Sequence, residues 1–179
     1  MRVLRFVLVA MIVVNFAIAA AAWPTLPERI PIHFDAAGNA DGWAARSVWT
    51  WFALPALGAV IGAGFGLVLP ALTMRMARAN SPWLNVPDKK AFSALSTAAR
   101  ERVIASSMAW LVAIAIAAQA VLGFVAFGSA KVAVGAWSRL SPWPAWCLIG
   151  SILVCAVGLV IASHRAVRRE TTADPGASA

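Results

Sequence analysis

Charged residues are scarce in this chain: they make up 12% of its 179 residues, whereas hydrophobic residues make up 61%. A soluble globular domain carries about 25% charged residues, and the mean hydropathy of +0.79 is far too high for such a domain. The composition therefore excludes an ordinary soluble protein and predicts an integral membrane protein. At this length we expect one bundle of a few spans, with no separate soluble domain.

Four apolar runs are long enough to cross the hydrocarbon core as helices. The spans are predicted at 3–22, 48–72, 103–127 and 145–163, so that residues 1–163 form a single all-α membrane domain. Residues 23–47 and 73–102 are predicted loops, and residues 164–179 a basic and then disordered tail. A cleaved signal peptide is the alternative for the first run, but that run exceeds the roughly 7 to 15 apolar residues of such a signal.

Ionisable side chains are absent from the four predicted spans away from their ends. Channels and proton-coupled transporters place such groups inside the membrane, so a transporter is the poorer hypothesis. The polar exceptions, Asn15 and Gln119, are predicted to make interhelical hydrogen bonds. Cys147 and Cys155 lie eight positions apart, about 12 Å along a helix, which is too far for a disulfide. No cofactor is expected.

Positive charge predicts the orientation, because lysine and arginine in short loops stay on the cytoplasmic side. Eleven of the 15 basic residues lie at the N-terminus, in the basic loop 73–102 or after the fourth predicted span. We therefore expect both termini in the cytoplasm and the loop 23–47 outside a bacterial cytoplasmic membrane. The net charge of +8 needs no nucleic acid to explain it, since anionic lipid headgroups suffice.

Tryptophans gather at the predicted outer ends of the spans, where their amphipathic rings favour the headgroup level. Seven of the nine lie there: Trp23, Trp43, Trp49, Trp51, Trp137, Trp143 and Trp146. We interpret them chiefly as interfacial anchors, with ligand stacking by Trp43 or Trp49 as the alternative.

Glycines line one face of the second predicted span, at Gly58, Gly62 and Gly66. This doubled G-x-x-x-G pattern favours close helix packing. It leaves open whether the partner is the third span or a second copy of the chain in a homodimer.

The segment IPIHFDAAGNADGW, residues 30–43, is the most polar and most patterned part of the chain. Ile30, Ile32 and Phe34 alternate with His33 and Asp35, which predicts an extended segment. Pro31 restricts this segment to an edge strand or a lone arm. Residues 36–42, which include Gly38, Asn39, Asp41 and Gly42, predict a tight turn.

Three functions compete for this segment. A metal site could use His33, Asp35 and Asp41, although their spacing matches no standard zinc or calcium motif. A hydrolase could use His33 as base and Asp35 to orient it, but no nucleophile motif accompanies them. The third hypothesis is a folded cap over the bundle that doubles as a recognition surface.

The basic loop also shows a pattern. Apolar residues recur at Phe92, Leu95, Ala99 and Val103 with basic residues opposite, which predicts a short amphipathic helix running into the third span. We expect it to lie on the headgroups or to pack under the bundle.

Two stretches carry a resemblance to a known family. LPERIPIHFDAAGNADGWAARS after the first span resembles the motif of a bacterial membrane family of unknown function, a module found at the N-terminus of SdpI-type immunity proteins, and NVPDKKAF resembles a second segment of that family. The resemblance implies motif roles for Pro31, His33, Phe34, Gly38, Asp41, Gly42 and Trp43 in the first stretch and for Asn85, Pro87 and Lys89 in the second. SdpI-type relatives carry further spans, protect a cell from its own secreted toxic peptide and hold a repressor at the membrane.

These observations predict a four-helix membrane protein that acts by binding rather than by catalysis. We expect the loop 23–47 to bind a peptide, lipid or envelope component, and the basic loop 73–102 to contact lipid or a cytoplasmic protein. The alternative is a metal-dependent membrane enzyme with its site in the loop 23–47.

Overall fold

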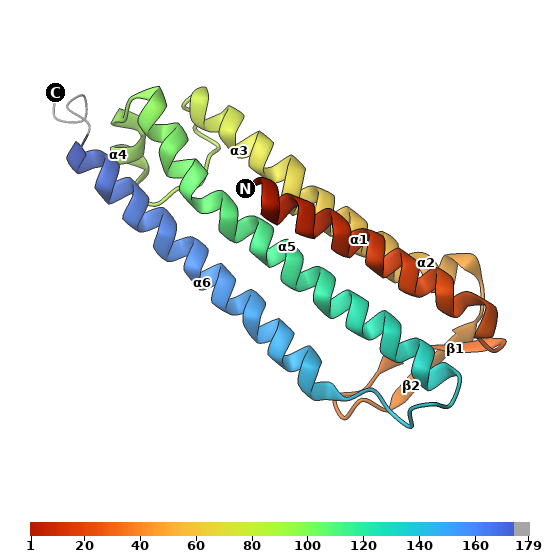
Figure 1. Ribbon diagram of the computed structural model, residues 1–179. Coiled ribbons are helices and arrows are strands. Elements are labelled where there is room, and N and C mark those ends of the chain that lie inside the picture. Colours follow the sequence, from red (N-terminus) through yellow and green to blue (C-terminus); the bar gives the residue numbers. More distant parts are fainter. Residues whose placement is uncertain (174–179) are drawn as a thin grey trace.

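The computed structural model describes residues 1–173 and is predominantly helical (Figure 1). The elements in chain order are α1 (Arg2–Ala22), the 3-10 turn η1 (Trp23–Thr25), β1 (Arg29–Phe34), β2 (Ala40–Ala45), α2 (Val48–Ala63), the π-helical segment η2 (Gly64–Val68), α3 (Leu69–Arg78), α4 (Lys89–Ala94), α5 (Thr97–Ala133) and α6 (Pro142–Ala173).

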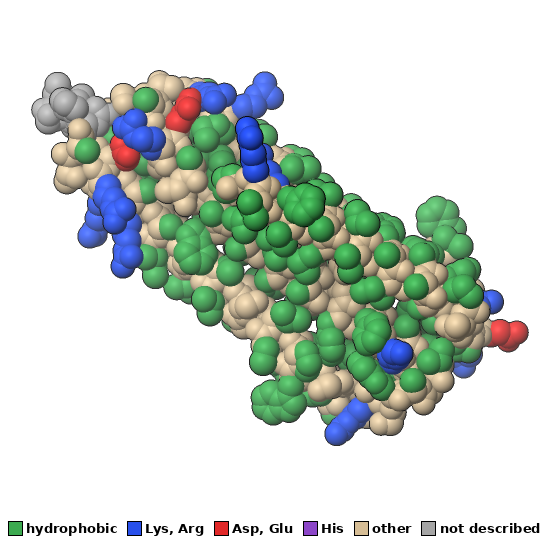
Figure 2. All heavy atoms as spheres, viewed as in Figure 1, with side chains coloured by type: hydrophobic (Ala, Val, Ile, Leu, Met, Phe, Trp, Pro, Cys, Tyr) green, Lys and Arg blue, Asp and Glu red, His purple; other side chains and the backbone are tan. Residues whose placement is uncertain are grey.

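Four helical stretches in this part of the chain are long and apolar enough to cross a membrane: Arg2–Thr25, Val48–Arg78, Thr97–Ala133 and Pro142–Ala173. The space-filling view shows hydrophobic side chains over the middle of the molecule, with lysine and arginine at its two ends (Figure 2). This distribution matches a multi-pass membrane protein and confirms the predicted fold class.

Helix α5 lies at the centre of the bundle, with α6 on one side and α1, α2 and α3 on the other (Figure 1). Helix α6 packs against α5 alone over most of its length, and within residues 142–173 Val167 is the one buried side chain. Most of the apolar surface of α6 is therefore left to contact lipid.

A buried polar contact joins three of the spans. The Asn15 side-chain amide on α1 donates to Oε1 of Gln119 on α5 at 2.9 Å and to the Gln119 carbonyl at 3.1 Å. The Gln119 amide in turn donates to the carbonyl of Gly58 on α2 at 2.5 Å. These bonds confirm the predicted interhelical role of both residues, because no water inside a bilayer could satisfy their polar atoms.

The glycine face of α2 and η2 is covered within the chain. Gly58 lies against Gln119, Gly62 against Ile12 and Gln119, and Gly66 against Leu8. The face therefore packs on α1 as well as on the expected third span. All three glycines are buried, so a homodimer through this face would require α1 and α5 to move away.

The second span continues beyond its predicted end. It runs to Arg78 rather than to Leu72, and its irregularity lies at Gly64–Val68, just before Pro70. A proline lacks the N–H for the helical bond to the residue four positions earlier, and a π-helical segment is a usual accommodation. Pro55 lies inside the regular part of α2, and the irregular segment lies in the middle of the span, just before Pro70.

The predicted amphipathic helix of the basic loop is two helices. The helical conformation ends at Leu95. The Ser96 hydroxyl then caps α5 by accepting a hydrogen bond from the Ala99 N–H at 3.3 Å, as serine commonly does at a helix start. Phe92, Leu95, Ala99 and Val103 are all buried in one apolar cluster with Ala77, Leu84, Ile104, Met108 and Val167. The segment therefore packs under the bundle rather than lying free on the headgroups.

The last two spans are longer than predicted. Helix α5 covers 97–133 instead of 103–127, and α6 covers 142–173 instead of 145–163. Residues 170–173, predicted to be disordered, are helical because Glu170 and the threonines after it bond back to α5 or to the preceding turn of α6. The rest of the predicted tail, 174–179, lies outside the described residues.

Candidate functional site: the hairpin and the pockets beneath it

The patterned segment folds as an antiparallel β-hairpin at the end of the bundle opposite α4 (Figure 1). Pro31 pairs with Trp43, His33 with Gly42 and Phe34 with Ala40, with irregular register between these pairs. The turn is shorter than predicted. Asp41 and Gly42 belong to β2, because the register irregularity lets strand pairing resume directly after Asn39.

The apolar side chains of β1 are only partly covered. Ile30 is 1% exposed and Pro31 is buried, but Ile32 is 57% exposed and Phe34 is half-buried. His33 and Asp35 face solvent, as the predicted alternation requires. The hairpin thus presents an apolar strip and a polar strip at the same end of the bundle.

Asp35 organises the turn between the strands. Its carboxylate accepts bonds from the backbone N–H of Ala37 at 2.9 Å and of Asn39 at 2.8 Å, and from the Asn39 side-chain amide at 2.9 Å. These bonds, chiefly that of the Asn39 side chain, lower the pKa of Asp35 below its ordinary value. Asp35 therefore stabilises the turn and is turned toward Asn39.

Gly38 docks this turn onto the loop between α5 and α6. Its φ is +85°, and its carbonyl accepts a bond from the Leu140 N–H at 2.8 Å. A Cβ at this position would overlap the backbone carbonyl oxygen of Leu140. Both the positive φ and the close approach therefore require glycine here.

His33 pairs with Asp41 across the strands and not with Asp35. The distance from Nδ1 of His33 to Oδ1 of Asp41 is 2.5 Å, and both side chains are largely exposed. Gly42 lies opposite His33, and a Cβ there would come within 2.8 Å of the His33 Cβ. Within residues 1–173 no three His, Cys, Asp or Glu side chains gather as metal ligands would, so the hairpin does not bring His33, Asp35 and Asp41 together.

Two pockets lie beneath the hairpin. The first, of about 350 Å³, lies between β1, α2 and α5 and is lined by Pro31, Trp51 and Leu54 among others. The second, of about 310 Å³, lies between the hairpin, α5 and α6 and includes His33, Asp35 and Trp146.

Ile32, Phe34 and Val125 line both pockets, so the half-exposed apolar strip of β1 separates them. Nothing in the sequence indicated that Val125 and Leu140 would line these pockets, because they lie far from the hairpin in the chain, on α5 and in the loop after it. The sequence marked Trp146 as one of the tryptophans at this end, but it gave no sign that Trp146 would lie beside the hairpin.

The tryptophans at this end differ in their exposure. Trp49, Trp143 and Trp146 are exposed, as interfacial anchors would be. Trp51 is buried and donates from Nε1 to the Ala19 carbonyl at 2.8 Å, so it joins α2 to α1 instead. Trp43 is 41% exposed on β2, and Nε1 of its ring donates to the Ala40 carbonyl at 3.3 Å.

The second motif lies at the opposite end of the molecule. The Lys89 ammonium donates to the Pro82 carbonyl, while Asn85 and Pro87 line a pocket of about 200 Å³ between α3, α5 and α6. Asp88, which follows Pro87, caps α4, because its carboxylate accepts a hydrogen bond from the Ala91 N–H at 3.2 Å. This motif shapes the basic loop and is not part of the hairpin site.

Comparison with known proteins gives one family match. Neither the curated proteins nor the solved structures that were compared yielded a match to this chain. Residues 10–59, which include most of α1, the whole hairpin and most of α2, match the family described as a domain of unknown function (DUF1648). The chain is thus similar to that family over the hairpin site and the two helices that hold it.

Proposed function

We propose that this chain is a non-enzymatic binding protein of the bacterial cytoplasmic membrane, which recognises a peptide or another envelope component through its hairpin. The observation that carries the proposal is the apolar strip of Ile32 and Phe34, which stands half-exposed between two pockets. Concave, mostly apolar sites with a few polar groups at the rim are typical of ligand recognition.

The rim supplies polar groups on one side. His33 and Asp35 line the second pocket, and Asp41 holds the His33 ring from the neighbouring strand. An extended peptide could place apolar side chains in the two pockets while its backbone meets this polar strip. The resemblance to SdpI-type immunity proteins, which protect a cell from its own secreted toxic peptide, supports a peptide as the ligand, and immunity or sensing is the role we propose for this chain.

The proposed orientation places the hairpin outside and both termini in the cytoplasm. It is supported by the basic residues of the loop around α4 and of the C-terminal part of α6, which would meet cytoplasmic lipid headgroups or a cytoplasmic protein.

Site-specific photocrosslinking tests the proposal. Benzoylphenylalanine replaces Ile32 in living cells, and the matched control replaces Val60, which is 70% exposed on α2 and away from the hairpin. We expect a discrete peptide or envelope adduct at position 32 that is absent at position 60. A Val125→Phe change, which places a larger side chain in both pockets, should abolish the adduct at position 32.

Lipid adducts alone at both positions would contradict the proposal. Elemental analysis of purified wild type beside His33→Ala tests the enzyme alternative. A stoichiometric metal that is lost with His33 would favour a metal-dependent enzyme over a binding protein.

A further inference from the structure

A groove of about 510 Å³ lies between α5 and α6, at the end of the bundle opposite the hairpin. One half of it is charged and is lined by Arg102, Arg165, Arg169 and Glu170. The other half is uncharged and mostly apolar, and its lining includes Trp110, Gly158, Ile161 and Ala162. The two halves follow each other along the axis of α6, because residues 158–162 belong to its apolar stretch and residues 165–170 to its basic end.

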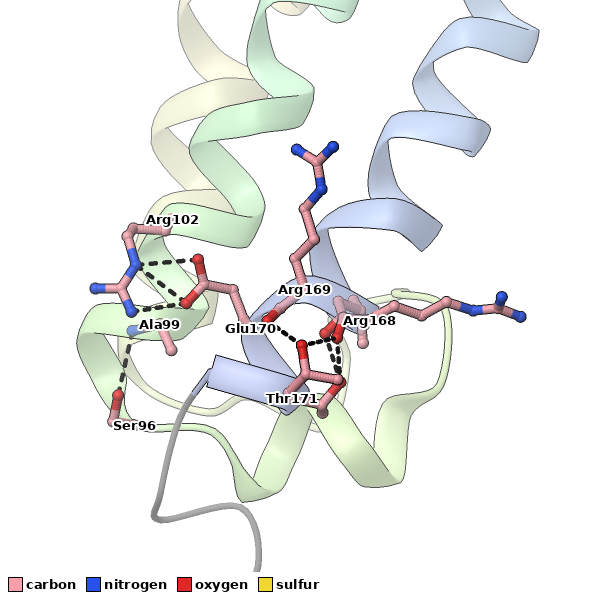
Figure 3. Close-up of polar contacts among 9 residues, drawn as sticks. Ser96, Ala99, Arg102, Arg168, Arg169, Glu170 and Thr171 are labelled. Atoms are coloured by element: carbon pink, nitrogen blue, oxygen red, sulfur yellow. Dashed lines mark hydrogen bonds and ion pairs between the residues drawn. The ribbon is translucent and has the colours of Figure 1, made fainter.

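The charged half has an excess of positive charge. Arg102 forms a two-pronged ion pair with Glu170, whose closest distance is 2.7 Å. Within residues 1–173, the side chains of Arg165 and Arg169 make neither a hydrogen bond nor an ion pair. In the close-up, Arg102 reaches across to Glu170 and Arg169 extends between the two helices, whereas Arg168 points away from them (Figure 3). Two guanidinium groups are thus left for an anion.

The apolar half is shaped by a tryptophan and a glycine. The Trp110 ring on α5 packs closely against Gly158 on α6, where a Cβ would come within 2.5 Å of the ring. Ile161 and Ala162 continue this wall toward the arginines. Trp110, Ile161 and Ala162 therefore form the apolar lining of the groove next to its charged half.

From this arrangement we infer that the groove binds one anionic phospholipid. Arg165 and Arg169 hold its phosphate and headgroup, and an acyl chain lies against Trp110, Ile161 and Ala162. Basic pockets between spans are typical binding sites for such headgroups. A soluble phosphate or an acidic peptide would match only the charged half, whereas a phospholipid matches the charge and the apolar wall in the order in which they occur.

Native mass spectrometry of the full-length protein in detergent tests this inference. The protein is titrated with dioleoyl-phosphatidylglycerol and, separately, with dioleoyl-phosphatidylcholine, which has the same chains and no net charge. At about fivefold per arginine near a membrane surface, we expect phosphatidylglycerol to bind about 25-fold more tightly. The double variant Arg165→Gln/Arg169→Gln should lose that preference.

Two further variants make the test specific. Arg168→Gln removes one charge from the same turn of α6 but not from the groove, so we expect the preference to remain. Ala162→Phe keeps every charge and fills the apolar half, so we expect it to weaken both lipids. Circular dichroism of each variant verifies that the helices are intact.

Three results would overturn the inference. The first is that Arg168→Gln lowers the preference for phosphatidylglycerol as much as the single variant Arg169→Gln does, which would mean a diffuse charge effect. The second is unchanged binding in Ala162→Phe, and the third is displacement of phosphatidylglycerol by inorganic phosphate. Because this groove is remote from the hairpin, none of these results bears on the proposed recognition of a peptide.

Discussion

Gly38→Ala is the change that most directly tests how the hairpin is held on the bundle. Alanine at φ +85° costs about 1 to 2 kcal/mol. Its Cβ would also overlap the Leu140 carbonyl oxygen, a backbone atom that no rotamer change can move. Relieving the overlap breaks the bond from the Leu140 N–H to the Gly38 carbonyl, at about 0.5 to 1.5 kcal/mol, and strains the loop by about 1 to 3 kcal/mol.

Gly135→Ala is the matched control for this change. Gly135 has nearly the same conformation, with φ +73°, but has no atom within 4 Å of the position of a Cβ. We therefore expect Gly135→Ala to cost only the conformational term, about 1 to 2 kcal/mol, and Gly38→Ala to cost about 2.5 to 6.5 kcal/mol.

Two measurements distinguish the variants. Unfolding by sodium dodecyl sulfate in mixed micelles gives the change in free energy, and hydrogen exchange gives the protection of the Leu140 amide. Protection should fall in Gly38→Ala and stay unchanged in Gly135→Ala. Equal destabilisation by both changes, with the Leu140 amide still protected, would refute the argument that the close approach requires glycine.

Three further predictions concern the bundle, the turn and the orientation. Gln119→Leu removes two interhelical hydrogen bonds, each worth about 0.6 kcal/mol in a membrane, so it should cost about 1 kcal/mol in the same unfolding assay. A double-mutant cycle with Asn15→Ala should then be non-additive, and strict additivity would argue against the contact. Because the folded-state pKa of Asp35 is lowered from 3.8, its stabilisation of the turn is fully present above that pH and is lost as the pH falls through the lower folded value. Hydrogen exchange of the turn between pH 5 and pH 2 should show this loss, and Asp35→Asn should remove the dependence. In a protein without its native cysteines, a membrane-impermeant maleimide should label Ala36→Cys in intact cells and Ser93→Cys only after lysis, and the reverse pattern would invert the proposed orientation.

Much of the candidate site could be predicted from the sequence. The alternation of residues 30–35 indicated an extended segment, and the glycines with Asn39 and Asp41 indicated the turn that follows it. The role of Asp35 in holding that turn came only from the structure. The sequence could not show which carboxylate meets His33, because that depends on the strand register, and the register places Asp41 opposite it. Nor could it show the pockets, whose walls include Val125 from α5 and Trp146 from α6.

By itself the sequence determined the number and approximate position of the spans, because crossing a hydrocarbon core demands a minimum length of apolar helix whatever its neighbours are. It also determined that Asn15 and Gln119 had to find polar partners, since their side chains cannot stay unpaired in that medium. Only the tertiary structure decided which surfaces meet. The glycine face of α2 could pack on any helix with a matching surface, and the packing of Leu8 and Ile12 from α1 into it is a property of the assembled bundle. Helix packing of this kind depends on shape complementarity between segments far apart in the chain, which no local pattern of residues encodes.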